Sequence, residues 1–266
     1  MTLGVVGSLK DKPVIVTGGA SGIGAATALL AAGAGAPVGV LDINAAGADE
    51  VAESCRKQGS SAVGIECDVS SETSVAGAVA HCVETLGVPH GLVAAAGVDA
   101  GGLVHQMDED DWAFVLGVNA TGAFLTAKHV TSAMLAEGAG GSIVLVSSAA
   151  AFVSFGAGKM GAYAASKGAV SALARAMAVD YGSLRIRVNA LVPGATETPL
   201  MWSNVPTGSI AEARKEVSRE VPLGRLATPE EPAHAALWLL SDDSSYVTGG
   251  HLVCDGGMLA KSCVPF

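Results

Sequence analysis

Short apolar runs alternate with segments of helical pattern along the whole chain. The apolar runs predict strands at 13–19, 37–42, 61–69, 91–97, 141–148, 185–194 and 251–257. The segments between them predict helices at 23–35, 45–58, 72–86, 108–135, 162–181 and 229–240, with a loop region at about 195–228. Because strands and helices alternate and the strands are apolar on both faces, the pattern predicts an α/β fold with a parallel sheet between helical layers. No repeat, linker or low-complexity tail interrupts this pattern, so we expect one domain over 1–266.

Composition narrows the classes of function. Half of the 266 residues are hydrophobic and 15% are charged, which supports a large buried core and argues against disorder. The formal net charge is −10 and no basic patch stands out, so we expect neither nucleic-acid binding nor attraction to anionic membranes. Segment 25–41 is nearly all apolar, but it contains three glycines and a proline and falls short of a membrane span.

Cysteine and histidine usage and the first residues of the chain add further expectations. The five cysteines include no CxxC pair, so we expect no disulfide framework and a reducing cytoplasm as the compartment. The six histidines show no metal-ligand spacing, so no metal site is predicted. The first residues lack a basic start followed by a long apolar run, so we expect no signal peptide.

The segment TGGASGIG (17–24) joins the first predicted strand to the first predicted helix. Glycines there let the backbone approach a pyrophosphate, and the helix N-terminus supplies N–H donors and a positive dipole. The segment therefore predicts a dinucleotide site, although an ordinary glycine-rich turn is the alternative. The candidate residues are Gly18, Ser21, Gly22, Ile23 and Gly24.

An acidic residue ends each of the next two predicted strands. Asp42, followed by Ile43, lies close to the spacing expected of an acid that binds ribose hydroxyls. No arginine or lysine occurs in the glycine turn or just after Asp42, which favours NAD over NADP; the alternative is an aspartate that caps a helix. Asp68, followed by Val69, could contact adenine, but a plain role in a turn is about as plausible.

Tyr163 and Lys167 are four residues apart in YAASK, among small side chains. In a helix this spacing places both on one face. A free tyrosine has a pKa near ~10, and a nearby ammonium favours the phenolate, so we expect Lys167 to lower the pKa of Tyr163. The alternative is a helix tyrosine beside a solvated lysine.

Several motifs together carry a family resemblance. TGGASGIG, Asp42, GVNATGAF around Asn119, SIVLVSS, YAASK and PGATETP occur in the order seen in short-chain dehydrogenases/reductases, and the resemblance covers about residues 8–258. It implies a single Rossmann-type, doubly wound domain with three α/β/α layers. It also implies that Tyr163 is the general acid/base, that Lys167 tunes it and holds the nicotinamide ribose, and that Ser148 binds the substrate oxygen. Asn119 would hold a water in a proton relay.

Alternatives remain for two of these roles. Ser147 precedes Ser148 and could replace it, and Asn119 could be an exposed helix residue. The resemblance also implies cofactor contacts at Ala95, Gly97, Pro193, Gly194, Thr196 and Thr198. The family's Asn-Asn-Ala-Gly is replaced here by Ala94-Ala95-Ala96-Gly97, so the sheet end must be bonded in another way.

Two segments are expected to form the substrate walls. The interval between the serine and the tyrosine contains Phe155, and the loop after Thr198, which usually closes over substrate in this family, contains Met201 and Trp202. Both walls are largely apolar, which favours a neutral alcohol or ketone over a phosphorylated or acyl-carrier substrate, although a sugar could also bind. The family also implies a homotetramer.

Taken as a resemblance, these features predict an NAD-dependent oxidoreductase that interconverts a secondary alcohol, or a sugar or cyclic alcohol, and its ketone. Two other functions stay open: an NADPH-dependent reductase of 3-ketoacyl type, and a non-catalytic NAD-binding sensor or scaffold. The sequence names neither the substrate nor the direction or stereochemistry of the reaction.

Overall fold

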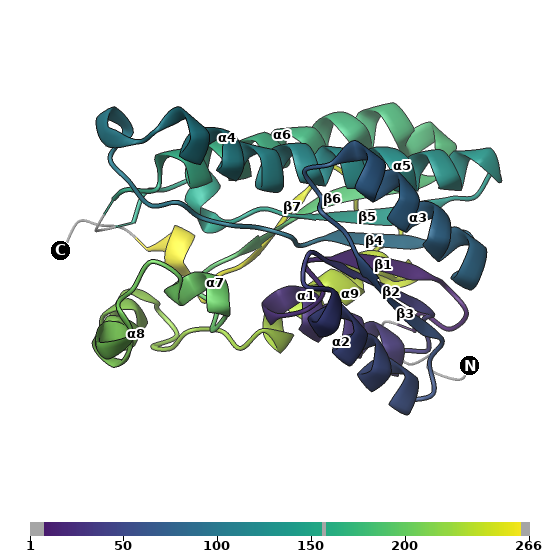
Figure 1. Ribbon diagram of the computed structural model, residues 1–266, viewed down its shortest axis with the longest axis horizontal. Helices are drawn as coiled ribbons and strands as arrows, with labels where there is room; N and C mark the ends of the chain where they lie inside the picture. The colour runs from purple at the N-terminus through teal and green to yellow at the C-terminus, as the bar shows by residue number, and fades with distance from the viewer. Residues whose placement is uncertain (1–7, 156–157, 262–266) are drawn as a thin grey trace.

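A computed structural model describes residues 8–155 and 158–261, and in this part of the chain a parallel sheet forms the centre (Figure 1). Its strand order is β3-β2-β1-β4-β5-β6-β7. The strands are β1 (Val14–Thr17), β2 (Val38–Asp42), β3 (Ala62–Glu66), β4 (Gly91–Ala94), β5 (Gly141–Val146), β6 (Ile186–Pro193) and β7 (His251–Cys254). The predicted α/β fold of doubly wound, Rossmann type is confirmed.

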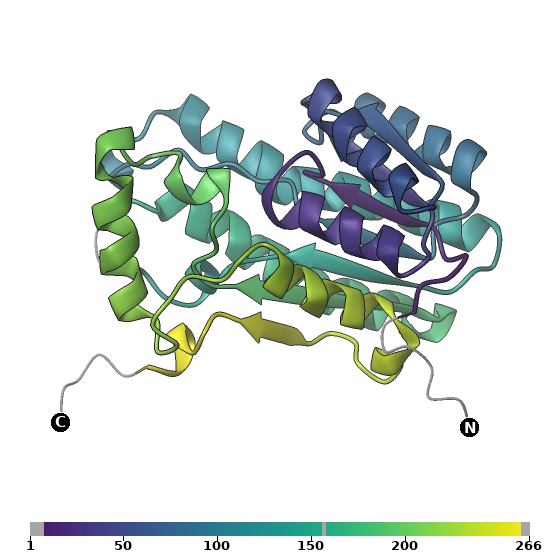
Figure 2. The same ribbon diagram turned by 90° about the horizontal axis from the view of Figure 1, so that it is seen from below.

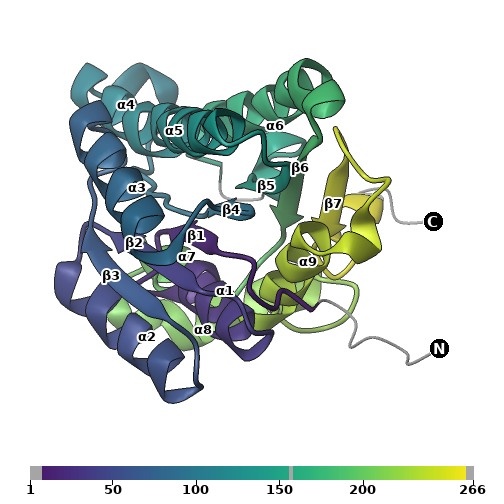
Figure 3. The ribbon, with the colours of Figure 1, turned by 90° about the vertical axis from the view of Figure 1, so that its right-hand side faces the viewer.

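Helices cover both faces of the sheet (Figure 3). One layer holds α1 (Gly22–Gly33), α2 (Ala45–Lys57) and α9 (Glu230–Leu240). The other layer holds α3 (Glu72–Leu86), α4 (Glu109–Leu116), α5 (Gly122–Ala136) and α6 (Gly161–Tyr181). Each layer packs its own apolar cluster against the sheet, which explains why the central strands are buried on both faces.

The strand order reverses direction at the β1–β4 pair. Thr17 pairs with Ala94, and the chain leaves both strands at the same edge of the sheet. In open parallel sheets, ligands bind at the carboxyl ends of the strands where the order reverses. The fold therefore directs attention to the loops that follow β1 and β4.

Two predicted boundaries were wrong. The helix predicted at 108–135 is interrupted by a π-helical turn, η2 (Gly117–Thr121), which separates α4 from α5. The region predicted as a loop at 195–228 contains α7 (Pro199–Trp202) and α8 (Ile210–Glu220). Helix α8 has no fully buried residue, and its apolar stripe is short, because only Ile210, Ala213 and Val217 are apolar and partly buried on one face. In Figure 2 it stands at the far end of the molecule from the N-terminus, beyond the carboxyl ends of the strands.

Candidate active site

The glycine turn between β1 and α1 adopts a conformation that only small residues permit. Gly18 has a φ of +66°, and a Cβ atom there would lie 2.7 Å from the Cα of Ala96 in the loop after β4. A Cβ at Gly24 would lie 2.1 Å from the Gly18 carbonyl oxygen. The turn is thus wedged against the neighbouring strand end, and α1 begins at once behind it at Gly22. The N-terminus of α1 has no side-chain cap from Ser21.

Asp42 is held beside this turn. The Ala20 N–H donates to its Oδ2 (3.0 Å) and the Asn44 N–H donates to its Oδ1 (2.9 Å). Asn44 is the residue that caps α2, because its side chain accepts from the Gly47 N–H (3.1 Å), so the helix-cap alternative for Asp42 was wrong. The carboxylate instead stands at the end of β2 next to the glycine turn, with the exposed side chain of Ile43 beside it.

The two residues predicted at the end of the third strand lie just beyond β3. Asp68 accepts from both the backbone N–H (2.9 Å) and the hydroxyl (2.7 Å) of Ser70, so its carboxylate organises a turn. Val69 is buried and packs against Gly122 at the start of α5. In this structure the plain turn role describes Asp68 well.

Ala94 and Ala95 replace the family's asparagines, and the backbone at this point is held by hydrogen bonds to Thr17 of β1. The Ala95 N–H donates to the Thr17 carbonyl (3.2 Å), and the Ala96 N–H lies 3.5 Å from the Thr17 hydroxyl. The end of β4 is therefore fastened to β1 without amide side chains. This backbone also leaves no room for a Cβ at Gly18, which would lie 2.7 Å from the Ala96 Cα.

Lys167 is buried beneath Tyr163 on α6. Its side chain is 3% exposed, and its Nζ donates to the Val146 carbonyl (2.9 Å) at the end of β5. The ammonium lies 5.6 Å from the centre of the Tyr163 ring. Burial lowers the pKa of Lys167 from its usual 10.5 to about 8, so the group still carries its proton at neutral pH. The alternative of a solvated lysine was wrong.

Tyr163 does not have the lowered pKa that the spacing predicted. Burial raises the pKa of the phenol above 10, a hydrogen bond with Ser148 lowers it, and the negative charge of Asp99 raises it further. Lys167 sits under the ring and is bonded to the strand, so its charge does not reverse the effect of burial. The predicted lowering was therefore wrong for this structure.

Ser148 and Ser147 separate into different roles. Ser148 is half-buried, accepts from the Ala150 N–H (3.1 Å) and bonds Tyr163. The Ser147 hydroxyl is buried, donates to the Lys167 carbonyl (2.9 Å) and shares a hydrogen bond with Ser171 (2.8 Å). Ser147 thus fastens α6 to β5, and the structure favours Ser148 as the residue beside the phenol.

Asn119 lies in the π-helical turn η2 and is 1% exposed, so the exposed-asparagine alternative was wrong. Its side chain accepts from the Val98 N–H (2.8 Å) and donates to the Val98 carbonyl (2.9 Å). It also donates to the Ser166 hydroxyl (3.0 Å) on α6. The π-helical turn therefore positions the Asn119 amide so that it connects the loop after β4 to α6, the helix that carries Tyr163.

The segment after β6 closes over the glycine turn. A Cβ at Gly22 would lie 3.0 Å from the Thr198 methyl group, which places the two loops in contact. Thr198 caps α7 by accepting from the Met201 N–H (3.3 Å). Thr196 is buried, and its hydroxyl donates to the Gly194 carbonyl (3.1 Å). Pro193 ends β6, and Gly194 is packed against Asp255.

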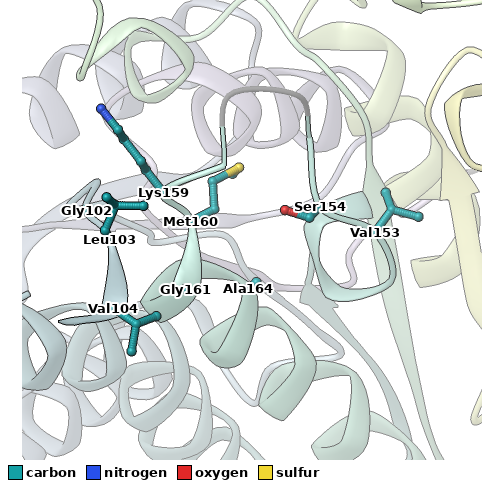
Figure 4. Close-up of a pocket in the computed structure, with 9 residues that line it drawn as sticks. All are labelled: Gly102, Leu103, Val104, Val153, Ser154, Lys159, Met160, Gly161 and Ala164. Carbon is teal, nitrogen blue, oxygen red and sulfur yellow. The ribbon is translucent and has the colours of Figure 1, made fainter. Parts of the chain in front are cut away.

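The side chains predicted for the substrate walls do not line the pocket beside the site. A pocket of about 180 Å³ lies between the loop after β4 and the segment before α6 (Figure 4), but Phe155, Met201 and Trp202 do not line it. Its lining residues are Gly102, Leu103, Val104, Val153, Ser154, Lys159, Met160, Gly161 and Ala164. Trp202 instead donates to Glu197 (3.1 Å) and stacks beneath Arg214 of α8.

Asp99 is a residue of this region that the sequence patterns did not single out. It follows Gly97 by two positions, and its charge acts on Tyr163. An acidic residue so soon after the carboxyl end of a central strand was the available signal.

Comparison with known proteins identifies the family. The family model described as "Enoyl-(Acyl carrier protein) reductase" matches residues 18–259. A structure titled as a short-chain type dehydrogenase/reductase from Mycobacterium marinum superposes with a TM-score of 0.91 at 32% identity, covering 96% of this chain and 98% of that one. The chain belongs to the short-chain dehydrogenase/reductase family. Short-chain dehydrogenases use a nicotinamide cofactor, NAD or NADP.

Two curated short-chain dehydrogenases are also similar over nearly their whole length. Cis-4-hydroxycyclohexanecarboxylate dehydrogenase from Sinomonas cyclohexanicum is 41% identical over 254 residues, covering 95% of this chain and 98% of the relative. 2,5-Dichloro-2,5-cyclohexadiene-1,4-diol dehydrogenase from Sphingobium indicum is 40% identical with the same coverage. Membership of this family, together with these named dehydrogenases, supports an oxidoreductase that acts on CH–OH groups.

Two further observations concern membrane spans and metal sites. None of the helices in the described residues is long and apolar enough to cross a membrane. Within residues 8–155 and 158–261, no three His, Cys, Asp or Glu side chains are grouped so that they could hold a metal ion.

Proposed function

We propose that this protein is an NAD-dependent dehydrogenase that interconverts a secondary alcohol and its ketone, with Tyr163 as general acid/base. The observation that carries the proposal is the buried cluster at the switch point of the sheet. Tyr163 bonds Ser148 there, above the buried cation of Lys167, and the Lys167 Nζ lies close to the loop after β4 that contacts the glycine turn. A phenol and a hydroxyl side by side can together bind an alcohol oxygen and exchange its proton.

The residues around the glycine turn fit a nicotinamide cofactor. At Gly18, Gly22 and Gly24 the backbone is open because these residues lack Cβ atoms, so a pyrophosphate could approach it closely. The N-terminus of α1 lies directly behind this cradle of open backbone. When bound, the cofactor supplies the acceptor or donor of the hydride. The other proposed cofactor contacts lie around the same cradle, at the neighbouring strand ends or in the segment after β6. They are Ser21, Ile23, Ile43, Ala95, Gly97, Pro193, Gly194, Thr196 and Thr198. Asp68 and Val69 remain weaker proposals because of their turn and core roles.

The choice of NAD rests on Asp42. Its carboxylate is fixed at the end of β2 by two backbone N–H groups, and a carboxylate accepts from ribose hydroxyls and repels a 2′-phosphate. No basic side chain lies in the glycine turn or in the residues directly after Asp42 that could offset this repulsion. The NADPH-dependent reductase therefore remains the second candidate.

The remaining tetrad residues have distinct tasks. Ser148 donates to the substrate oxygen and aligns it with Tyr163. Lys167 keeps a positive charge under the phenol, because its lowered pKa of about 8 still lies above neutral pH. Asn119 holds the Val98 backbone and Ser166 in place, and we propose that it also supports the path by which the proton of Tyr163 reaches solvent.

The substrate class follows from the relatives and the site. Two similar dehydrogenases are named for cyclic alcohols, a hydroxycyclohexanecarboxylate and a cyclohexadiene diol. We propose a cyclic secondary alcohol for this protein as well. Phe155, Met201 and Trp202 are retained as proposed substrate contacts. We further propose that the protein works in the cytoplasm as a homotetramer of one domain spanning 1–266; residues 1–7, 156–157 and 262–266 lie outside the described part.

The deciding experiment follows reduction of NAD and of NADP by the purified protein with cyclohexanol and cyclohexanediols. We expect turnover with NAD in preference to NADP. Tyr163→Phe should lower kcat by about 10²- to 10⁴-fold, the usual contribution of a general acid/base. Binding of NAD, measured by calorimetry, should persist in this variant.

Tyr181→Phe, at the far end of the same helix, is the matched control and should retain activity. A Tyr163→Phe enzyme as active as the control would overturn the proposed role of the phenol. Binding of NAD without any turnover in the unaltered protein would instead support the sensor or scaffold.

A further inference from the structure

The loop after β4 carries an acidic side chain into the region of the tetrad. A Cβ at Gly97 would lie 3.5 Å from the Asn119 Oδ1 and 3.6 Å from the Lys167 Nζ, so this backbone passes directly over both residues. Val98 is clamped on its N–H and its carbonyl by the Asn119 amide. The direction of the chain at Asp99 is therefore fixed, and its charge is close enough to Tyr163 to raise the pKa of the phenol.

The Asp99 carboxylate has one engaged oxygen and one unengaged oxygen. Its Oδ2 accepts from the Asn204 side chain (3.1 Å). Its Oδ1 is buried and makes no hydrogen bond of ordinary geometry with any residue that the structure describes. Burial raises the pKa of this carboxyl, although the Asn204 amide and the nearby Ala100 N–H both lower it. A buried acceptor without a partner is uncommon in a folded protein and calls for a ligand or a water.

The segment that covers the site meets Asp99 from the other side. Asn204 comes just after α7, and Leu200 of α7 lies 3.8 Å from the Cβ position of Gly97. The contact between Asp99 and Asn204 thus links the loop after β4 to the segment expected to close over substrate. The carboxylate stands between the tetrad and this segment, so a substrate held by Tyr163 would extend toward it.

We propose that Asp99 binds the substrate by accepting a hydrogen bond on Oδ1 from a second hydroxyl, and that the preferred substrate is therefore a cyclic diol. This inference rests on the proposed dehydrogenase function. An ionised carboxylate only accepts hydrogen bonds, so the group it binds must be a donor, and a ketone, ether or carboxylate at that position is disfavoured. An ammonium donor is disfavoured too, because burial at Asp99 raises the cost of placing a further charged group there.

The test compares cis-1,2-cyclohexanediol with cyclohexanol, in the protein and in Asp99→Ala and Asp99→Asn. A site built to bond a hydroxyl discriminates against the analogue that lacks it. We expect kcat/KM to favour the diol by at least about tenfold, and we expect Asp99→Ala to reduce this ratio to near one. Asp99→Asn, which keeps one acceptor oxygen, should retain part of the preference. Asp108→Asn, an exposed aspartate at the start of α4, is the matched control and should keep the full ratio.

If Asp99→Ala lowers kcat/KM for the diol and for cyclohexanol by the same factor, the proposal is overturned. Such a result would show that Asp99 acts on Tyr163 or on folding and does not bind the second hydroxyl. Preference for trans-2-aminocyclohexanol over the diol would also overturn it. If the unaltered protein oxidises no alcohol, the proposed function fails. The role of Asp99 is then tested separately, by measuring with thermal shift how the diol and cyclohexanol bind to the NADH-loaded protein. Stabilisation by the diol that is lost in Asp99→Ala supports the role of Asp99, and equal shifts in both proteins reject it.

Discussion

Lys167 shows how burial and chemistry compete at one side chain. Among the described residues its ammonium bonds one acceptor, the Val146 carbonyl, and it is enclosed by α6 and the ends of β4 and β5. The drop of its pKa from 10.5 to about 8 means that the folded state holds this charge at an energetic disadvantage. A residue placed only for stability would not be charged here, which agrees with the proposed role of Lys167 in catalysis.

Lys167→Met should stabilise the fold while it removes activity. The charge penalty corresponds to about 3 kcal/mol at ~1.36 kcal/mol per pKa unit, and loss of the bond to Val146 costs about 1–2 kcal/mol. We therefore expect a Tm a few degrees higher at pH 7, measured by calorimetry, with kcat reduced by about 10²-fold or more.

The pH dependence supplies the check on this prediction. The folded protein releases the Lys167 proton above pH 8, whereas the unfolded chain keeps it until about pH 10.5, so the penalty shrinks between these values. The gain in Tm should shrink over the same window. Other titrating groups are the same in Lys167→Met and in the unaltered protein, so their effects cancel in the difference between the two Tm values. A Tm that falls at pH 7 would show that the ammonium stabilises the fold.

At the level of elements, the site is made by the way a few turns fit together. The π-helical turn η2 points Asn119 at the loop after β4, the glycine turn presses against that same loop, and α7 covers both. These segments come from four separate parts of the chain. Where the glycine turn meets the loop after β4, backbone atoms lie so close that a Cβ at Gly18 has no room.

Gly18→Ala tests this fit. The new Cβ would lie 2.7 Å from the Ala96 Cα, and the φ of +66° is unfavourable for alanine, so we expect a loss of more than about 2 kcal/mol in the free energy of unfolding. Urea denaturation measures this change, and calorimetry should show weakened binding of NAD in any folded fraction.

Gly77→Ala is the matched substitution. Gly77 lies exposed in the middle of α3, and a Cβ there meets nothing within 4 Å. It should stabilise the protein by about 0.5–1 kcal/mol, because alanine loses less backbone entropy in a helix. Similar effects of the two substitutions would contradict the close approach described for Gly18.

At the scale of the whole molecule, one helical layer exposes large apolar side chains. Phe114 on α4 is 53% exposed, Phe124 on α5 is 47% exposed and Val179 on α6 is 83% exposed. Figure 1 shows these three helices along one side of the molecule. Exposed apolar side chains gathered on one layer are a common feature of protein interfaces. They agree with the proposed homotetramer, in which the long central helices meet.

Light scattering after size exclusion should give about four times the 26.2 kDa chain mass. Phe124→Glu should lower that mass, because a carboxylate cannot be buried between subunits without a partner. Lys57→Glu, on the exposed side of α2, is the control and should leave the mass unchanged. A single-chain mass for the unaltered protein would reject the homotetramer.

The sequence by itself determined the fold class and most of the elements, because alternating apolar runs specify a parallel sheet regardless of how the loops are arranged. It also placed the glycine turn, Asp42, Tyr163 and Lys167, since each depends on spacing within one element or on its position at a strand end. The interruption at η2 and the presence of α8 escaped it. The first shifts the helical register by about one residue within a long apolar segment, and the second has no fully buried residue.

Only the tertiary structure decided which groups meet and how their charges act on one another. It separated Ser147 from Ser148, because burial and bonding partners differ for neighbouring residues that spacing cannot distinguish. It reversed the expected shift of the Tyr163 pKa, because burial depends on every segment packed around the phenol. It also brought Asp99 to the tetrad and Asn204 to Asp99, over a separation of 105 residues that no local pattern records.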